Sequence, residues 1–329
     1  MKICIFGSGA IGSYIGSLLI KGGADVSLIC RGEHLKAIQN KGLLMQSKET
    51  KEEYFCKPKA SDDPGSLGKQ DFIIVTLKAH SAALTAKLLL PLLGDNTSVL
   101  SAVNGLPWWY FYKSGDKYEN KKLISVDPKN EQWDFIRPQR ALGCVVYPAA
   151  EIKKPGHVIH SEGNKLLIGE PDGSLSERAK IISTILIQSG FKSPVRKKIR
   201  EDIWMKLWGN LAFNPISALT GSTLEDLAND KDTCKVIRDM MKEGENVAKA
   251  LGISFPISLE QRIEGTRKVG QHKTSTLQDL ELGRPMEIDA LTKSVSEAGK
   301  IVGIETPTID MVYSLVRLKA QESGCYPNP

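Results

Sequence analysis

The sequence predicts an α/β protein of two domains, a parallel-sheet domain followed by an all-α domain. Short apolar runs alternate with helical patterns over residues 1–100, which is typical of parallel strands joined by crossover helices. A glycine-rich turn, GSGAIG, directly follows the first apolar run. After about residue 199 every long segment has helical periodicity. We therefore expect a nucleotide-binding domain at 1–199 and an α-helical domain at 200–329.

The expected strands of the first domain are short apolar runs, which suit buried parallel strands. In chain order they are KICIF, DVSLIC, DFIIVTL, TSVLSAV and RALGCVVYPA. The stretch HVIHSEGNKLLIG predicts a hairpin, and a capping box of Ser174 and Glu177 predicts the start of a helix that ends at Gly190. Residues 107–140 lose this pattern and are rich in aromatic side chains, so we interpret them as a long insert or flap.

Composition and charge narrow the class of protein. The 329 residues carry a formal net charge of +6, but the basic residues are scattered, and a solvated connector explains the densest cluster, VRKKIRED, at least as well as a nucleic-acid patch. We expect no nucleic-acid partner. No stretch after the glycine-rich amino terminus approaches the roughly 18 apolar residues of a membrane span, so we expect no membrane contact. The six cysteines form no C-x-x-C pair, which favours reduced thiols in a cytoplasmic protein and no metal site.

The GSGAIG turn lies between the first expected strand and the mouth of the first helix. Its glycines permit a tight turn and let a pyrophosphate approach the helix end, where the amides and the dipole favour anions. The alternative is a glycine-rich turn without a ligand. We favour dinucleotide binding in a Rossmann-type domain because the turn follows the first strand directly. The expected cofactor-binding residues of this turn are Gly7, Ser8, Gly9, Ala10, Ile11 and Gly12.

The end of the second expected strand indicates which dinucleotide is bound. NAD-binding domains of this type place an acid there, whereas this chain has Arg31. An arginine fork matches a 2'-phosphate, so the expected cofactor is NADP(H). The alternative is that Arg31 pairs with Glu33 at the surface. Lys78 and Asn104 follow two further strands, and we expect them at the same ligand-binding edge, although a surface lysine and an Asn-Gly turn would explain them as well.

A polar stripe crosses the apolar segment IWMKLWGNLAFNPISAL. Lys206, Asn210 and Asn214 are four residues apart and share one helix face. Burying unpaired amides or an ammonium costs on the order of a few kcal/mol, so the stripe needs partners. A bound polar ligand would supply them, as would hydrogen bonds between helices with Lys206 reaching solvent. A second polar stretch, HKTSTLQDLELGRPMEIDAL, contains Ser275 and Glu287, and its alternative interpretation is a solvated face.

With these motifs in order, the chain resembles the 2-dehydropantoate 2-reductases, also called ketopantoate reductases, over nearly its whole length. The resemblance is carried by GSGAIG, the arginine after the second strand, TLKAH, VNGLP and the two polar stretches. It implies NADPH-dependent reduction of 2-dehydropantoate to (R)-pantoate, on the route to pantothenate and coenzyme A. The domain at 1–199 would then bind NADP(H), and the domain at 200–329 would supply the substrate-binding and catalytic groups.

The resemblance also implies residue roles. Lys206 matches the family's general acid, which protonates the carbonyl oxygen, and Glu287 matches the acid that holds a substrate hydroxyl. Asn104 matches an asparagine between nicotinamide and substrate, and Lys78 a lysine that assists Arg31 at the adenosine phosphate. The remaining substrate-binding positions are Asn210, Asn214 and Ser275.

The aromatic insert at 107–140 departs from compact members of that family. It could lie over the active site and alter the substrate pocket, or it could pack against the second domain or a subunit partner, and we favour packing. A reductase of another 2-oxo acid therefore remains an alternative, as does a protein that only senses NADP(H). The apolar helices of the second domain could also form a homodimer interface.

Overall fold

The computed structural model describes residues 1–327, and their contacts divide into two compact units. The first unit contains residues 1–103, 112–115 and 130–199. The second contains residues 104–111, 116–129 and the described residues from Arg200 onward. The aromatic segment 107–140 is therefore shared between the two units.

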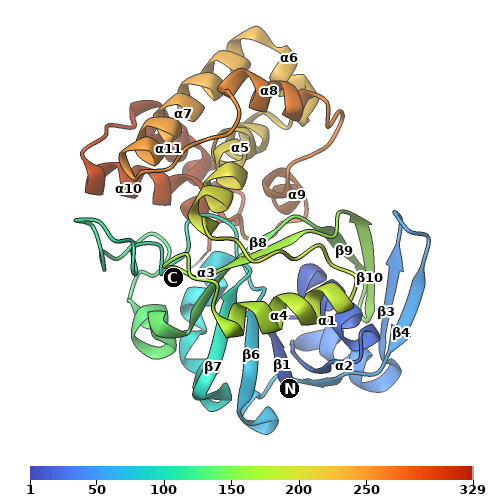
Figure 1. The fold of residues 1–329 in the computed structure, drawn as a ribbon. Helices are drawn as coiled ribbons and strands as arrows, with labels where there is room; N and C mark the ends of the chain where they lie inside the picture. Colours follow the sequence, from blue (N-terminus) through green and yellow to red (C-terminus); the bar gives the residue numbers. More distant parts are fainter. Residues whose placement is uncertain (328–329) are drawn as a thin grey trace. The chain divides into compact units, whose positions relative to one another are not determined.

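A seven-stranded sheet organises the first unit, in the order β11-β8-β7-β6-β1-β2-β5 (Figure 1). All neighbouring pairs are parallel except β11 with β8. The predicted Rossmann-type α/β class is confirmed, since β1 lies inside the sheet between the parallel strands β2 and β6, whose carboxyl ends form one edge. The strands are β1 Lys2–Phe6, β2 Asp25–Ile29, β5 Lys59–Ser61, β6 Gln70–Val75, β7 Leu93–Ser101, β8 Ala141–Val146 and β11 Leu166–Gly169.

A second, four-stranded sheet has the order β4-β3-β10-β9. The predicted hairpin at 157–169 is wrong, because β10 pairs with β9 and β3 whereas β11 leaves to join β8. The actual hairpin joins β9 to β10 through Pro155 and Gly156, and Gly156 has the positive φ of +75° that a tight turn needs. The strands are β3 Leu43–Ser47, β4 Glu53–Cys56, β9 Ala149–Lys154 and β10 His157–Glu162.

Helix α1 (Ala10–Lys21) contacts strands of both sheets, so its faces are almost entirely buried. Its Tyr14 ring stacks on His160 of β10 with 4.2 Å between centroids and meets Phe191 edge to face. The other helical segments of this unit are α2 Gly32–Lys41, η1 Pro64–Leu67, α3 Ala79–Leu84, η2 Ala86–Leu92, the π-helix η3 Gln132–Ile136, η4 Pro138–Arg140 and α4 Glu177–Gln188.

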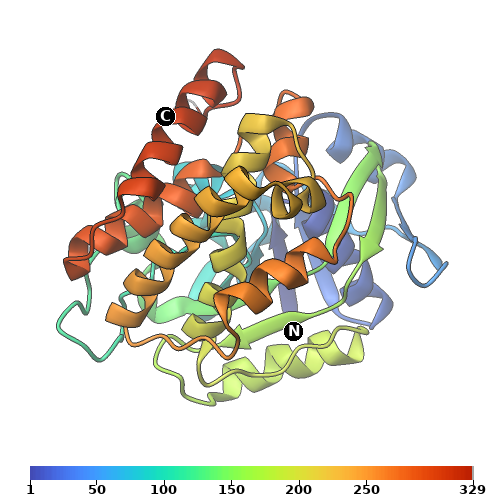
Figure 2. The ribbon, with the colours of Figure 1, turned by 90° about the horizontal axis from the view of Figure 1, so that it is seen from above.

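The second unit is helical, and α7 lies beside α8, α10 and α11 (Figures 1 and 2). The Trp208 indole N–H donates to the carbonyl oxygen of Met241 at 2.8 Å and ties α5 to α7. No helix within residues 1–327 is long and apolar enough to cross a membrane. The helical segments are α5 Ile199–Thr220, α6 Leu224–Asn229, α7 Lys231–Ala250, α8 Leu259–Arg267, α9 Ser275–Glu281, the π-helix η5 Asp289–Lys293, α10 Ser294–Val302 and α11 Pro307–Glu322.

The aromatic residues at the start of the insert are packed inside the second unit. Trp109, Tyr110 and Phe111 are buried. The Trp204 indole N–H donates to the Tyr110 hydroxyl at 2.7 Å, and Arg200 Nε donates to the Tyr110 carbonyl at 2.8 Å. Of the two expectations for this segment, packing therefore describes residues 109–111, because their rings fill the core beside α5.

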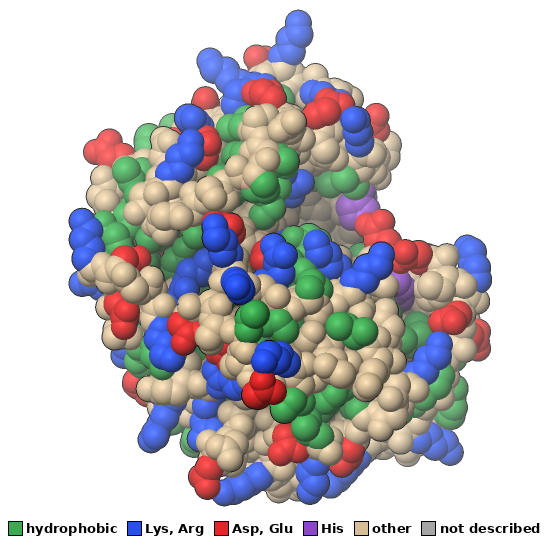
Figure 3. All heavy atoms as spheres, viewed as in Figure 1, with side chains coloured by type: hydrophobic (Ala, Val, Ile, Leu, Met, Phe, Trp, Pro, Cys, Tyr) green, Lys and Arg blue, Asp and Glu red, His purple; other side chains and the backbone are tan. Residues whose placement is uncertain are grey.

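Charged side chains of both signs are spread over the face drawn in Figure 3, where lysines and arginines alternate with acidic residues. Several surface acids pair with neighbouring lysines, such as Glu177 with Lys180 at 2.6 Å and Glu245 with Lys249 at 2.6 Å. The Glu177–Lys180 pair is exposed and contributes at most about 1 kcal/mol, whereas the Glu245 side chain is only 15% exposed.

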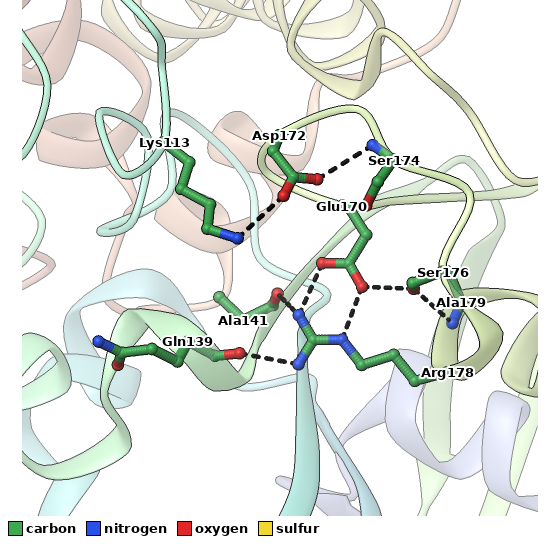
Figure 4. Close-up of polar contacts among 9 residues, drawn as sticks. All are labelled: Lys113, Gln139, Ala141, Glu170, Asp172, Ser174, Ser176, Arg178 and Ala179. Carbon is green, nitrogen blue, oxygen red and sulfur yellow. Dashed lines mark hydrogen bonds and ion pairs between the residues drawn. The ribbon is translucent and has the colours of Figure 1, made fainter.

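The turn between β11 and α4 is organised around a buried carboxylate (Figure 4). Glu170 is only 4% exposed and accepts two hydrogen bonds of 2.6 Å from Arg178 and one of 2.5 Å from Ser176. The predicted capping box is wrong, because Ser176 caps α4 at Ala179 N whereas the N–H of Ser174 donates to Asp172. Lys113 pairs with the same Asp172 at 2.9 Å, and these contacts hold the pKa of that carboxyl well below its usual range.

Arg178→Ala should destabilise the protein strongly because it leaves the Glu170 carboxylate buried without its cation. We expect a loss of about 3 kcal/mol in the free energy of unfolding, measured by urea denaturation at pH 7. Lys180→Ala is the matched control on the same helix, since its pair with Glu177 is exposed, and it should cost less than about 1 kcal/mol. Equal losses in the two variants would contradict a structural role for the buried pair.

Candidate active site

Three polar side chains from distant parts of the chain form a continuous hydrogen-bonded chain in the second unit. Lys206 Nζ donates to Asn104 Oδ1 at 2.8 Å. Asn104 Nδ2 donates in turn to Glu287 Oε2 at 3.0 Å. The asparagine amide therefore links an ammonium to a carboxylate and fixes the position of both. The structure thus brings together both predicted catalytic residues and one predicted substrate-binding residue.

Lys206 lies on the polar face of helix α5, and most of the apolar residues on the other faces of this helix are buried. Trp204, Leu207 and Trp208 are at most 2% exposed, whereas Lys206 is half-buried. A half-buried ammonium loses part of its hydration, so it requires polar partners. The Asn104 carbonyl is one such partner, and the predicted stripe is therefore bonded rather than simply solvated.

Asn104 reaches the stripe because the next residue is glycine. Gly105 has φ of +87°, and a Cβ built there would lie 2.1 Å from the carbonyl oxygen of Ala290. No other residue type fits between this turn and the backbone of η5. The Asn-Gly dipeptide is a turn, as the alternative interpretation held, and the same turn delivers the Asn104 amide to Glu287.

Glu287 lies at the start of an irregular helical segment. It is 8% exposed, and its carbonyl accepts from Leu291 N at 3.1 Å as the chain enters the π-helix η5. π-Helical turns are rare and occur often at functional sites. The segment is anchored through Asp289, whose carboxylate accepts from the hydroxyls of Tyr313 at 2.7 Å and Tyr326 at 2.9 Å.

The remaining predicted substrate-binding residues occupy α5 and α9. Asn214 is buried, and its Nδ2 donates to Thr276 Oγ1 at 3.2 Å, so the helix–helix hydrogen bond held as an alternative is present here. Ser275 is exposed as the first residue of α9, and Asn210 is half-buried on α5. Sequence reasoning missed Thr276, although its place directly after Ser275 in KTSTLQ was a signal for it.

In the first unit, the three glycines of GSGAIG differ in their surroundings. A Cβ at Gly7, where φ is +103°, would lie 2.6 Å from the Leu77 side chain, and one at Gly12 would lie 2.5 Å from Thr76 Oγ1. At Gly9 the nearest atom would be 4.0 Å away, so that position faces open space. No side chain caps α1 at Gly9. Open space before an uncapped helix terminus fits the pyrophosphate of a dinucleotide.

The loop is held between two strand ends. The N–H groups of Gly7 and Ser8 donate to the Ile29 carbonyl of β2 at 3.0 and 2.8 Å. From the other side, Thr76 Oγ1 donates to the Gly7 carbonyl at 2.8 Å. Thr76 was not predicted, and its only signal was its place at the end of the strand DFIIVTL. These bonds leave the loop little freedom before any ligand arrives.

Besides the glycine loop and Asn104, the predicted cofactor-binding residues are Arg31 and Lys78, which follow strands adjacent to β1. Arg31 is the exposed N-cap residue of α2, after β2, and Lys78 is the N-cap residue of α3, after β6. Glu33 pairs with Lys36 at 2.8 Å, so the structure does not favour the alternative pairing of Glu33 with Arg31. Arg31, the glycine loop and Lys78 therefore follow the carboxyl ends of three neighbouring strands.

Within residues 1–327, no group of three or more His, Cys, Asp or Glu side chains could hold a metal ion. The titratable groups brought together by the Asn104 amide are a lysine and a glutamate. Such a pair can donate a proton to a developing oxyanion and accept a hydrogen bond from a hydroxyl.

Comparison with known proteins identifies relatives across the whole chain. Residues 3–173 match the family model described as Ketopantoate reductase PanE/ApbA, and residues 198–320 match the model described as Ketopantoate reductase PanE/ApbA C terminal. A 2-dehydropantoate 2-reductase of Mesorhizobium japonicum is 49% identical over 327 residues, which cover 99% of this chain and 100% of that protein.

Solved structures give the same result. A crystal structure from Ralstonia solanacearum MolK2 superposes with a TM-score of 0.94 at 37% identity and covers 99% of each chain. The 2-dehydropantoate 2-reductase of Geobacter metallireducens GS-15 superposes with a TM-score of 0.84 at 25% identity and covers 97% of this chain and 100% of that one. The resemblance predicted from the motifs is confirmed: the chain belongs to the ketopantoate reductase family, a family of oxidoreductases.

Proposed function

We propose that the protein reduces 2-dehydropantoate to (R)-pantoate with NADPH, as a step toward pantothenate and coenzyme A. The observation that carries this proposal is the hydrogen-bonded chain Lys206–Asn104–Glu287. It offers one proton donor and one hydroxyl acceptor a short distance apart. A 2-oxo acid with a hydroxyl group, such as 2-dehydropantoate, requires both groups. The name of the Mesorhizobium relative supports the same substrate.

When bound, NADPH would supply the hydride for the carbonyl carbon of the substrate, whose oxygen would then need a proton. The Lys206 ammonium donates a proton to that oxygen, so the products are the alcohol and NADP⁺. Glu287 accepts the hydrogen bond of the substrate hydroxyl. Asn104 fixes the positions of Lys206 and Glu287 relative to each other through the two hydrogen bonds of its amide.

The other predicted residues bind and orient the reactants. Asn210, Asn214 and Ser275 supply amide and hydroxyl groups to the substrate carboxylate and hydroxyl. The glycine loop binds the pyrophosphate, with Gly9 leaving space for it. Arg31, assisted by Lys78, binds the 2'-phosphate, since a guanidinium matches its oxygens and stays charged at every accessible pH.

The direct test mixes purified protein with NADPH and 2-dehydropantoate and follows loss of nicotinamide absorbance, with NADH and other 2-oxo acids in parallel. We expect oxidation of NADPH with 2-dehydropantoate. Turnover only with another 2-oxo acid would be consistent with the proposed role of Lys206 but would show that 2-dehydropantoate is not the substrate. NADPH binding without turnover of any 2-oxo acid would favour a sensor of NADP(H).

Lys206→Ala should lower kcat by roughly 10²–10⁴ because it removes the proton donor. NADPH affinity, measured by calorimetry, should change less than about twofold because the lysine is not assigned to the dinucleotide. Lys242→Ala, at an exposed lysine of α7 paired with Glu245, is the control and should keep wild-type kcat. A Lys206→Ala enzyme with near wild-type kcat would remove this lysine from the mechanism.

Arg31→Ala should weaken NADPH binding by about tenfold or more, since hydrogen bonds to charged groups are worth roughly 1.5–3 kcal/mol. NADH lacks the 2'-phosphate, so its affinity should hardly change. Lys36→Ala, in the next turn of α2, controls for loss of a nearby positive charge. Equal effects of Arg31→Ala on both dinucleotides would contradict the assignment to NADP(H).

The protein is also proposed to form a homodimer through α11. Met311, Leu315 and Leu318 lie on one face of this helix and are 65%, 54% and 55% exposed. Leu315→Glu should convert a dimer to a monomer in light scattering because it places a charge in an apolar interface. Arg317→Glu is the control, because this exposed residue of the same helix lies two positions from Leu315 and so faces another side. A monomeric wild type would refute this assembly.

A further inference from the structure

Three polar side chains link helix α2 to the glycine loop of the first unit. His34 Nε2 lies 3.0 Å from Ser13 Oγ, and Ser13 Oγ lies 2.9 Å from Ser8 Oγ. Ser13 and Ser8 are 0% and 3% exposed. Ser8 is the second residue of GSGAIG, so the chain ends inside the loop rather than in the apolar core.

The direction of these hydrogen bonds follows from the other side of the imidazole. The Gly156 N–H donates to His34 Nδ1 at 3.1 Å, so Nδ1 presents its lone pair. The neutral ring then carries its proton on Nε2, which donates to Ser13 Oγ. Burial lowers the pKa of His34, which favours this neutral form.

The Ser13 hydroxyl must therefore direct its own hydrogen away from His34. Two acceptors are in reach, and both belong to Ser8: its carbonyl oxygen at 3.3 Å and its Oγ at 2.9 Å. When Ser13 donates to Ser8 Oγ, the hydrogen of the Ser8 hydroxyl is available to an oxyanion in front of the loop. The backbone of Ser8 is held separately, because its N–H donates to Ile29.

His34 also lies in the first turn of α2, three residues after Arg31. The start of α2 thus carries two groups near the proposed cofactor. Arg31 is assigned to the 2'-phosphate, and His34 reaches the glycine loop that is assigned to the pyrophosphate. We propose that His34 is a positioning residue for the cofactor, an inference that rests on the dinucleotide site of the proposed function. It orients the Ser13 hydroxyl toward Ser8 and thereby the Ser8 hydroxyl toward the dinucleotide phosphates, and it ties the glycine loop to the Arg31 turn.

The test measures NADPH affinity by calorimetry in the full-length protein, with the Tm of the ligand-free protein and kcat at saturating NADPH as separate readouts. The variants are His34→Leu, Ser13→Ala and the double variant. Ser17→Ala is a matched control, since Ser17 is buried on the same helix and donates only back to the Tyr14 carbonyl at 2.9 Å. His157→Leu is the histidine control, because that buried ring binds Gln46 at 2.7 Å.

His34→Leu and Ser13→Ala should each raise the Kd for NADPH about 3- to 10-fold, the effect of one lost hydrogen bond. The double variant should match the larger single effect, since both changes break one chain. His34→Gln should restore much of the affinity, because its amide can accept from Gly156 and donate to Ser13. We expect kcat at saturating NADPH to stay near wild type, and the two controls to bind NADPH normally whatever their Tm.

Unchanged NADPH affinity in both single variants, with normal binding by the wild type, would overturn this inference and leave the proposed function intact. Additive effects in the double variant would also overturn it, as would an equal loss of affinity in the His157→Leu control. Wild-type protein that binds neither NADPH nor NADH would overturn the dinucleotide site and this inference together.

Discussion

The cost of taking the Lys206 ammonium out of water is the constraint on which the second unit depends. Lys206 is half-buried on helix α5, so its charge needs polar partners from other segments. Asn104 supplies one, and Glu287 binds the same amide from the other side. The Gly105 turn, the close approach of η5 and the tyrosine anchors on Asp289 all follow from bringing these three groups together.

The aromatic insert packs beside α5, the helix that carries Lys206. Residues 109–111 are buried beside α5, and the hydroxyl and carbonyl of Tyr110 are bound by Trp204 and Arg200. Asn104 lies three residues before the insert, in the segment 104–111 of the second unit, so packing of these rings restrains the chain that carries this asparagine. The packing of the insert therefore restrains the position of Asn104, the residue that links Lys206 to Glu287.

The first unit is organised by a different constraint, the close approach of backbone to backbone at the glycine loop. Gly7 and Gly12 are packed against Leu77 and Thr76, whereas Gly9 is open. The loop donates hydrogen bonds to β2 and accepts one from Thr76. These bonds fix the shape of the loop without a ligand. A preformed loop loses little conformational entropy when a ligand binds, and this supports the proposal that the loop binds a dinucleotide.

The sequence by itself determined the fold class, the glycine turn and the polar stripe, because each depends on local periodicity or on residues a few positions apart. Tertiary structure alone decided the pairing of Asn104 with Lys206 and Glu287, the partners of β10 and β11, and the sharing of the aromatic insert between two units. It also revealed Thr276 and the link from His34 to Ser8. These features join segments tens to hundreds of residues apart, and no local pattern encodes which distant polar group will satisfy a buried donor or acceptor.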